Sequence, residues 1–140
     1  MKIQKYRFKV DLTQLQNDQL QVELRAPRLK QSSIVYYIPK IVPGIYGALD
    51  FGQYISDFKA FTAGGKRLRV ERIGKNGWKI WNAQYLFRIV YKVDDGFEAH
   101  SELGKAYYNS AASSFTDNEV FVINLNCLFG YFEGMTKLPI

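Results

Sequence analysis

The chain has 140 residues, a net charge of +6 and an aromatic content of 16%. This length suffices for one domain with a sizeable core, and the composition excludes a disordered or low-complexity chain. The positive charge permits attraction to anions, but lysines and arginines alternate along the predicted strands, so we predict no nucleic-acid partner. No segment reaches transmembrane length, so we predict no membrane partner either.

The first part of the chain predicts three strands. Apolar side chains occupy every second position in residues 6–12 and again in residues 20–26, which is the period of a half-buried strand. The polar residues 14–18 between them predict a turn, so the two segments form an antiparallel hairpin that Pro27 ends. Residues 33–38 are apolar at almost every position and predict a central strand that is covered on both faces.

A stiff apolar corner follows the third strand. Residues 39–47 contain two prolines four positions apart, and the second is followed by glycine. Proline fixes φ and glycine tolerates positive φ, as a tight turn requires, and the prolines exclude a helix interior or a central strand. We predict a corner that either shapes the fold or docks another domain. Its candidate residues are Pro39, Pro43, Gly44 and Tyr46, together with Gly130 near the end of the chain.

Further short strands are predicted between turn signals. Residues 46–56 predict a single helical turn, and residues 57–62 and 67–73 predict two strands joined by Ala-Gly-Gly. The Asn-Gly pair at positions 76 and 77 predicts another hairpin turn, followed by a strand over residues 78–81.

The last predicted strands complete the fold class. Alternation over residues 85–93 places Tyr85 on one face with four further apolar residues, and residues 119–125 predict a final strand that places Leu125 on one face with Phe121 and Ile123. Residues 97–118 show no period and predict a long excursion between strands. About eight short strands with regular turn signals predict an all-β fold, an antiparallel β-sandwich, as a single domain over residues 1–140.

Side chains for catalysis or metal binding are scarce. His100 is the one histidine, whereas a zinc enzyme usually takes two or three histidines as ligands. Cys127 is the one cysteine, which excludes an intramolecular disulfide, and its apolar neighbours predict a buried thiol. We therefore predict no catalytic residue, no metal ligand and no cofactor within this chain.

Aromatic side chains near strand ends leave an alternative open, because such rings bind sugars or peptides. On this hypothesis the chain is a stand-alone carbohydrate- or peptide-binding module. Strands favour aromatic residues in any case, so we expect most of these rings to pack in the core. The residues concerned are Tyr36, Tyr37, Tyr46, Trp78, Trp81, Tyr107, Tyr108 and Tyr131.

Four motifs follow one another in a distinctive order. They are Pro-Lys-Ile-Val-Pro-Gly-Ile-Tyr at 39–46, Ile-Ser-Asp-Phe-Lys-Ala at 55–60, Leu-Arg-Val through Asn-Gly-Trp-Lys-Ile at 68–80, and Leu-Phe-Gly-Tyr with Glu-Gly at 128–134. In this order they resemble the N-terminal domain of the glycyl-aminopeptidase family of zinc metallopeptidases, gluzincin-like enzymes that also carry a PDZ domain. The resemblance covers most of the chain.

The resemblance implies a non-catalytic N-terminal β domain that docks on a downstream catalytic domain and borders its substrate cleft. That downstream part would carry His-Glu-x-x-His, with zinc as cofactor and the glutamate as general base, and the PDZ domain would be a further partner in the same chain. Tyr131 and Glu133 are then candidate substrate-binding residues, with Glu133 placed to pair with the amino group of a substrate.

The apolar end of the chain, at residues 138–140, predicts a piece of a longer metallopeptidase. Separated from its neighbours, such a piece would expose its docking face, so we expect self-association of the isolated domain. The compartment stays open, and a periplasmic or secreted location would follow if a signal peptide had been removed.

Overall fold

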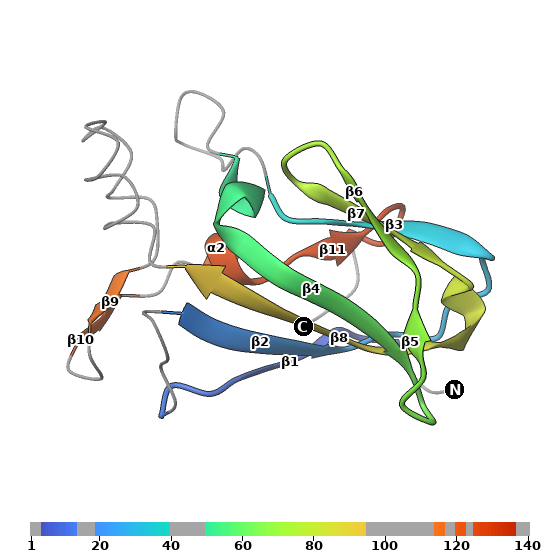
Figure 1. Cartoon of the computed structure of the whole chain (residues 1–140), viewed down its shortest axis with the longest axis horizontal. Helices are drawn as coiled ribbons and strands as arrows, with labels where there is room; N and C mark the ends of the chain where they lie inside the picture. The colour runs from blue at the N-terminus through green and yellow to red at the C-terminus, as the bar shows by residue number, and fades with distance from the viewer. Residues whose placement is uncertain are drawn as a thin grey trace.

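The structure, a computed structural model, describes residues 4–13, 19–39, 50–94, 114–116, 120–122 and 125–136. Two antiparallel sheets, of five and four strands, lie face to face as a sandwich, and a separate pair of short strands lies at one end (Figure 1). The predicted all-β sandwich is confirmed, with eleven short strands among these residues where about eight were expected. No helix in this part of the chain is long and apolar enough to span a membrane.

The five-stranded sheet contains the predicted first hairpin. In spatial order its strands are β1 (Arg7–Val10), β2 (Gln19–Arg25), β8 (Leu86–Asp94), β4 (Ile55–Thr62) and β5 (Arg67–Leu68). All neighbours pair antiparallel, which confirms the predicted hairpin of β1 and β2. The turn between β4 and β5 also lies where it was predicted, and Gly65 adopts a φ of 86° there, as a tight turn requires.

The four-stranded sheet covers the inner face of the first. In spatial order its strands are β11 (Tyr131–Phe132), β3 (Ser33–Tyr37), β7 (Gly77–Trp81) and β6 (Val70–Ile73). The other elements are η1 (Phe51–Tyr54), η2 (Ala83–Tyr85), the strand pair β9 (Ser114–Thr116) and β10 (Val120–Val122), and α2 (Leu125–Leu128). The single helical turn predicted before β4 is confirmed as η1, a 3-10 helix.

The core lies between the two sheets and follows from the alternation of apolar side chains. On β2, the residues Leu20, Val22 and Leu24 are fully buried, as the period-two pattern predicted. Phe58 stacks its ring between those of Trp78 and Tyr91, at centroid distances of 5.0 and 5.7 Å, and so joins the two sheets. Each large apolar side chain buried here contributes about 1.5–3 kcal/mol relative to exposure.

The segment predicted as one strand over residues 67–73 divides between the two sheets. Leu68 pairs with Ala60 in the five-stranded sheet, whereas Val70 pairs with Ile80 in the four-stranded sheet. Arg69 lies at the crossing, and its carbonyl accepts a hydrogen bond from the N–H of Trp81 at 3.0 Å. Periodicity alone cannot reveal such a crossing, because a strand that changes sheets still turns one face toward the shared core.

Residues 33–38 are not covered on both faces, so this prediction was wrong. Ile34, Tyr36 and Ile38 are buried, whereas Val35 and Tyr37 are half-buried on the outer face of the sheet. Their apolar side chains hide the alternation in the sequence, because a half-buried outer face tolerates valine and tyrosine.

The predicted strand positions of Tyr85 and Leu125 were also wrong. Tyr85 lies in η2 and is 63% exposed, and Leu86 is the buried residue at that end of β8. Leu125 begins α2 and is 58% exposed, so the strand predicted over residues 119–125 is shorter, as β10. Each residue lies just beyond a strand, since β8 begins at Leu86 and β10 ends at Val122, and a continued period-two count does not detect where a strand begins or ends.

Several predictions concern residues that lie outside the described part of the chain. They are Pro43, Gly44 and Tyr46 of the corner, His100, Tyr107 and Tyr108, and most of the predicted excursion over residues 97–118. The burial of the Cys127 side chain also lies outside it.

Candidate functional site

The predicted substrate-binding residues lie at and beside β11, an edge strand of the four-stranded sheet. Tyr131 pairs in register with Tyr37, and their ring centroids are 5.8 Å apart. Both rings are half-buried on the outer face, because the next residue, Phe132, points into the core. Glu133 follows in an exposed turn, and its N–H donates to the carbonyl of Val35 at 2.9 Å. Its carboxylate forms no ion pair with any residue that the structure describes.

Gly130 lies where α2 leads into β11, at a place where no side chain fits. A Cβ atom there would lie 2.3 Å from the carbonyl oxygen of Tyr37 and 2.6 Å from Cζ of Tyr36. The N–H of Gly130 donates to the Tyr36 hydroxyl at 2.9 Å. Gly130 therefore acts structurally, by letting the end of the chain approach β3.

Two buried tyrosines, Tyr36 and Tyr91, connect the sheets to this end of the chain; we call them the tyrosine relay. Their hydroxyl oxygens are 3.1 Å apart, and Tyr91 donates to the carbonyl of Leu128. Because the Tyr91 proton is used on Leu128, the hydrogen bond between the hydroxyls is donated by Tyr36. The Gly130 N–H thus donates to Tyr36, the Tyr36 O–H donates to Tyr91, and the Tyr91 O–H donates to the Leu128 carbonyl, which is the final acceptor.

Burial determines the protonation of the relay. Desolvation raises the pKa of both Tyr36 and Tyr91 above the ordinary value for tyrosine, so both hydroxyls stay neutral at physiological pH. Tyr6 makes a related contact outside the relay, because its hydroxyl accepts from the N–H of Phe132 at 2.8 Å and donates to the carbonyl of Met135 at 3.0 Å. These tyrosines hold the last described strand in place and carry no reactive charge.

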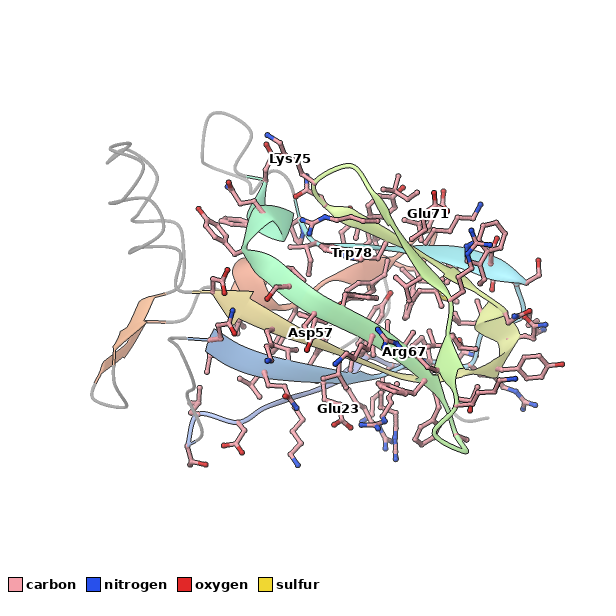
Figure 2. The ribbon with its side chains drawn as sticks, viewed as in Figure 1. Glu23, Asp57, Arg67, Glu71, Lys75 and Trp78 are labelled. Carbon is pink, nitrogen blue, oxygen red and sulfur yellow. The ribbon has the colours of Figure 1, made fainter. Side chains whose placement is uncertain are left out.

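Both ends of the predicted corner attach to the turn between β6 and β7. On the first side, Ile38 N–H, one residue before Pro39, donates to the carbonyl of Asn76 at 2.9 Å. On the second side, the Asn76 side chain accepts from Gly52 N–H at 3.0 Å and donates to Asp50 at 2.9 Å. Figure 2 shows Lys75 of the same turn beside η1. The described chain on both sides of residues 40–49 is therefore attached to the same turn.

Arg72 strengthens this attachment. Its guanidinium donates to the carbonyls of Gly52 and Lys75 at 2.9 and 3.0 Å. It also lies over the Trp78 ring, 4.8 Å from the centroid. Arg72 on β6 and Asn76 in the turn after it therefore both hold η1 in place, and no sequence motif revealed these contacts.

A hollow of about 250 Å³ lies beside the crossing between the sheets and is lined by arginine and apolar side chains, with no carboxylate, thiol or imidazole among them. No three His, Cys, Asp or Glu side chains come together in the described part of the chain, so these residues do not fit a metal ion.

The structure brings together part of the predicted site. Tyr37 is the last residue of β3, so Tyr131 opposite it lies at the same end of the sheet as Pro39 and Gly130. Sequence reasoning missed the tyrosine relay and the contacts of Asn76. One signal was available for the relay, because a tyrosine in the inward pattern of a strand needs a partner for its hydroxyl.

The fold and this site define a small antiparallel β-sandwich domain whose last described strand forms one edge of the four-stranded sheet. The chain belongs to the Peptidase M61 N-terminal domain family, whose sequence model matches residues 7–140. This confirms the family resemblance seen in the order of the sequence motifs.

A solved structure supports the same fold. An aminopeptidase N family protein from Idiomarina loihiensis superposes with a TM-score of 0.73 over 92% of this chain, at 21% sequence identity. The matched region is 20% of that protein, so the chain spans about a fifth of its length. A search of curated protein sequences finds no match.

Proposed function

We propose that this chain is the non-catalytic N-terminal domain of a longer zinc aminopeptidase, where it docks on the catalytic domain and borders the substrate cleft. The observation that carries the proposal is the match of residues 7–140 to an N-terminal domain of a peptidase family. The structural neighbour supports it, since four-fifths of that aminopeptidase family protein lies outside the matched region. Zinc, the His-Glu-x-x-His motif and a PDZ domain are proposed for the downstream part.

The docking surface that we propose is the end of the four-stranded sheet around β11. Pro39, Gly130 and Tyr131 lie at this end, and Glu133 lies in the exposed turn that follows β11. The half-buried rings of Tyr37 and Tyr131 supply the apolar contact area that a domain interface needs.

The reading frame downstream of residue 140 gives the first test. We expect a His-Glu-x-x-His motif within about a few hundred residues, and its absence would contradict the proposal. The isolated chain should cleave no glycyl substrate when zinc is added, whereas the full-length enzyme should do so. Cleavage by the pure isolated domain would contradict a non-catalytic role.

Glu133 has a separate test in the full-length enzyme. Glu133→Gln should raise KM for substrates with a free amino group and leave KM for N-acylated substrates unchanged, since the charge pairing is lost only for the former. Glu71→Gln is a matched control, because Glu71 is an exposed carboxylate on β6, at the other edge of the same sheet. Equal kinetics for the two variants would remove Glu133 from the site and leave the docking proposal intact.

Self-association of the isolated domain follows from the same proposal. A docking surface that lacks its neighbour exposes apolar side chains, and these favour contact between copies. Sedimentation velocity should therefore show a concentration-dependent rise in mass for the isolated chain. A monodisperse monomer at high concentration would argue against an apolar docking surface.

One observation favours the alternative of a binding module. Tyr37 and Tyr131 form a pair of half-buried rings on an outer sheet face, with interplanar angle 34°, and a sugar ring could stack on them. A glycan array with the isolated chain tests this, with Tyr131→Ala as the variant that should lose any signal. An array without signal would count against the module.

A further inference from the structure

Four arginines and one phenylalanine form a single row across the outer face of the five-stranded sheet. Arg7 lies opposite Arg25, and Arg25 lies opposite Arg88. Phe61 lies opposite both Arg88 and Arg67, and Figure 2 shows Arg67 at the β5 end of this row. We call these five residues the arginine row. Alternation along each strand predicted exposed cations, but only the register between strands aligns them.

Aromatic rings hold two arginines of this row in place, but carboxylates neutralise little of the row's positive charge. The guanidinium of Arg25 lies 4.5 Å from the ring centroid of Phe87, and that of Arg88 lies 4.6 Å from the centroid of Phe61. Among the described residues, the one ion pair of these arginines joins Arg88 to Glu23 at 3.8 Å, and both side chains of that pair are more than a third exposed. Such a pair contributes little, whereas like charges directly opposite each other on neighbouring strands destabilise a sheet.

The row ends in a hollow at the β1 edge, which we call the basic hollow. Its volume is about 200 Å³, and its lining includes four cationic side chains: Lys5, Arg7, Arg25 and Arg28. The rest of the lining is Gln4 with Ala26 and Pro27, so no carboxylate takes part. None of the four cations forms an ion pair with a described residue.

The walls of the basic hollow are held by buried contacts. Tyr6 lies between Lys5 and Arg7, is only 3% exposed, and is hydrogen-bonded to the backbone around β11. Alternation along the chain therefore turns Lys5 and Arg7 outward. On the other wall, Ala26 N–H donates to the carbonyl of Phe87 at 2.9 Å.

A side-chain contact also joins the two walls. The Gln4 side-chain amide donates to the carbonyl of Arg28 at 3.2 Å. The backbone on both sides is thus fixed before any ligand arrives, which reduces the entropy that binding would cost. Charged residues on an edge strand also prevent that strand from pairing with other chains. This role explains Arg7 on the edge strand β1, but it does not explain Arg25 and Arg28, which lie outside that strand.

We propose that the basic hollow binds an oxyanion ligand with at least two neighbouring phosphate or carboxylate groups. Guanidinium groups bind such oxygens in pairs of parallel hydrogen bonds, and three of the four cations are arginines. The ligand replaces the missing carboxylates and relieves the repulsion between Arg7 and Arg25. A free polyphosphate and an acidic peptide segment share this chemistry. The site is independent of the proposed peptidase role.

Isothermal titration calorimetry of the 140-residue chain tests this, with inorganic tripolyphosphate and a hexaglutamate peptide as probes. Wild type should bind at least one probe saturably at a single site. The double variant Arg7→Gln with Arg25→Gln should weaken binding by about tenfold or more, the loss expected for about 1.4 kcal/mol of charge-assisted hydrogen bonding. If tripolyphosphate binds more tightly, the oxyanion ligand is a free polyphosphate. If hexaglutamate binds more tightly, the ligand is an acidic peptide segment.

The matched control removes two charges from the hairpin of β6 and β7 in the other sheet. Lys75→Gln in the turn, combined with Lys79→Gln on β7, gives the same net charge and should weaken binding by less than about threefold, because both charges lie at a distance from the basic hollow. A thermal melt gives a second readout. Without a probe, the arginine double variant should melt no lower than wild type, because repulsion between the arginines is removed. With the probe, the melting temperature of wild type should rise, whereas that of the arginine double variant should not. Absence of saturable binding to wild type, or an equal loss in both double variants, would overturn the proposal.

Discussion

The tyrosine relay allows a quantitative prediction about stability. Tyr36→Phe leaves the buried N–H of Gly130 without its acceptor, and an unsatisfied buried donor costs about 1–3 kcal/mol. Tyr91→Phe leaves two groups without partners, the Leu128 carbonyl and the Tyr36 hydroxyl proton, so its cost should be larger, about 2–4 kcal/mol. Both variants keep the ring, so no large cavity forms and the loss reports hydrogen bonding.

The double variant distinguishes a connected relay from two separate contacts. Without either hydroxyl, only the Gly130 N–H and the Leu128 carbonyl remain unpaired. The loss should therefore be about 1 kcal/mol smaller than the sum of the single losses. Urea unfolding followed by circular dichroism measures all three values. Tyr37→Phe is the control, since Tyr37 is half-buried on an outer face, and it should change the free energy of unfolding by less than about 0.5 kcal/mol.

Two results would refute this reasoning. The first is a loss below about 0.5 kcal/mol for both single variants, which would mean that water satisfies the groups left behind. The second is strict additivity in the double variant, which would mean that the hydroxyls of Tyr36 and Tyr91 do not interact.

Three further predictions concern the same end of the molecule. Because burial raises the pKa of both relay tyrosines, they stay neutral in the folded chain at pH values where unfolded tyrosines ionise. Their contribution to stability is therefore fully present below about pH 10 and falls above it by about 1.4 kcal/mol per pH unit for each tyrosine. Urea unfolding at several alkaline pH values checks the slope, and a flat profile contradicts it. Gly130→Ala should destabilise the fold by about 3 kcal/mol or more, because the new methyl group would clash with Tyr37. Gly64→Ala is the control and should be neutral in the same thermal melts, because the nearest atom to its new methyl group would be 3.9 Å away. Equal effects of the two variants would rule out the clash. Asn76→Ala should cost about 1–3 kcal/mol and speed hydrogen exchange at the Gly52 amide, and unchanged exchange there would show that the side chain does not hold η1.

The sequence by itself determined the fold class and the family. Period-two alternation on β2, the turn residues at Gly65 and the Asn76-Gly77 pair are local signals, since side-chain alternation and turn geometry depend on a few neighbouring residues. The order of motifs from Pro39 onward carried the family resemblance. Of the candidate site, the sequence could point to Tyr131 and Glu133 only through that resemblance, because neither residue has a chemical signature of its own.

Tertiary structure alone decided which side chains meet. The crossing at Arg69 and the half-exposed face of Val35 depend on how the two sheets stack, which no local period encodes. The relay joins Tyr36 to Tyr91, 55 positions further along the chain, and the arginine row joins residues of all five strands. Such contacts follow from register, and register is determined by the packed face of the whole sheet.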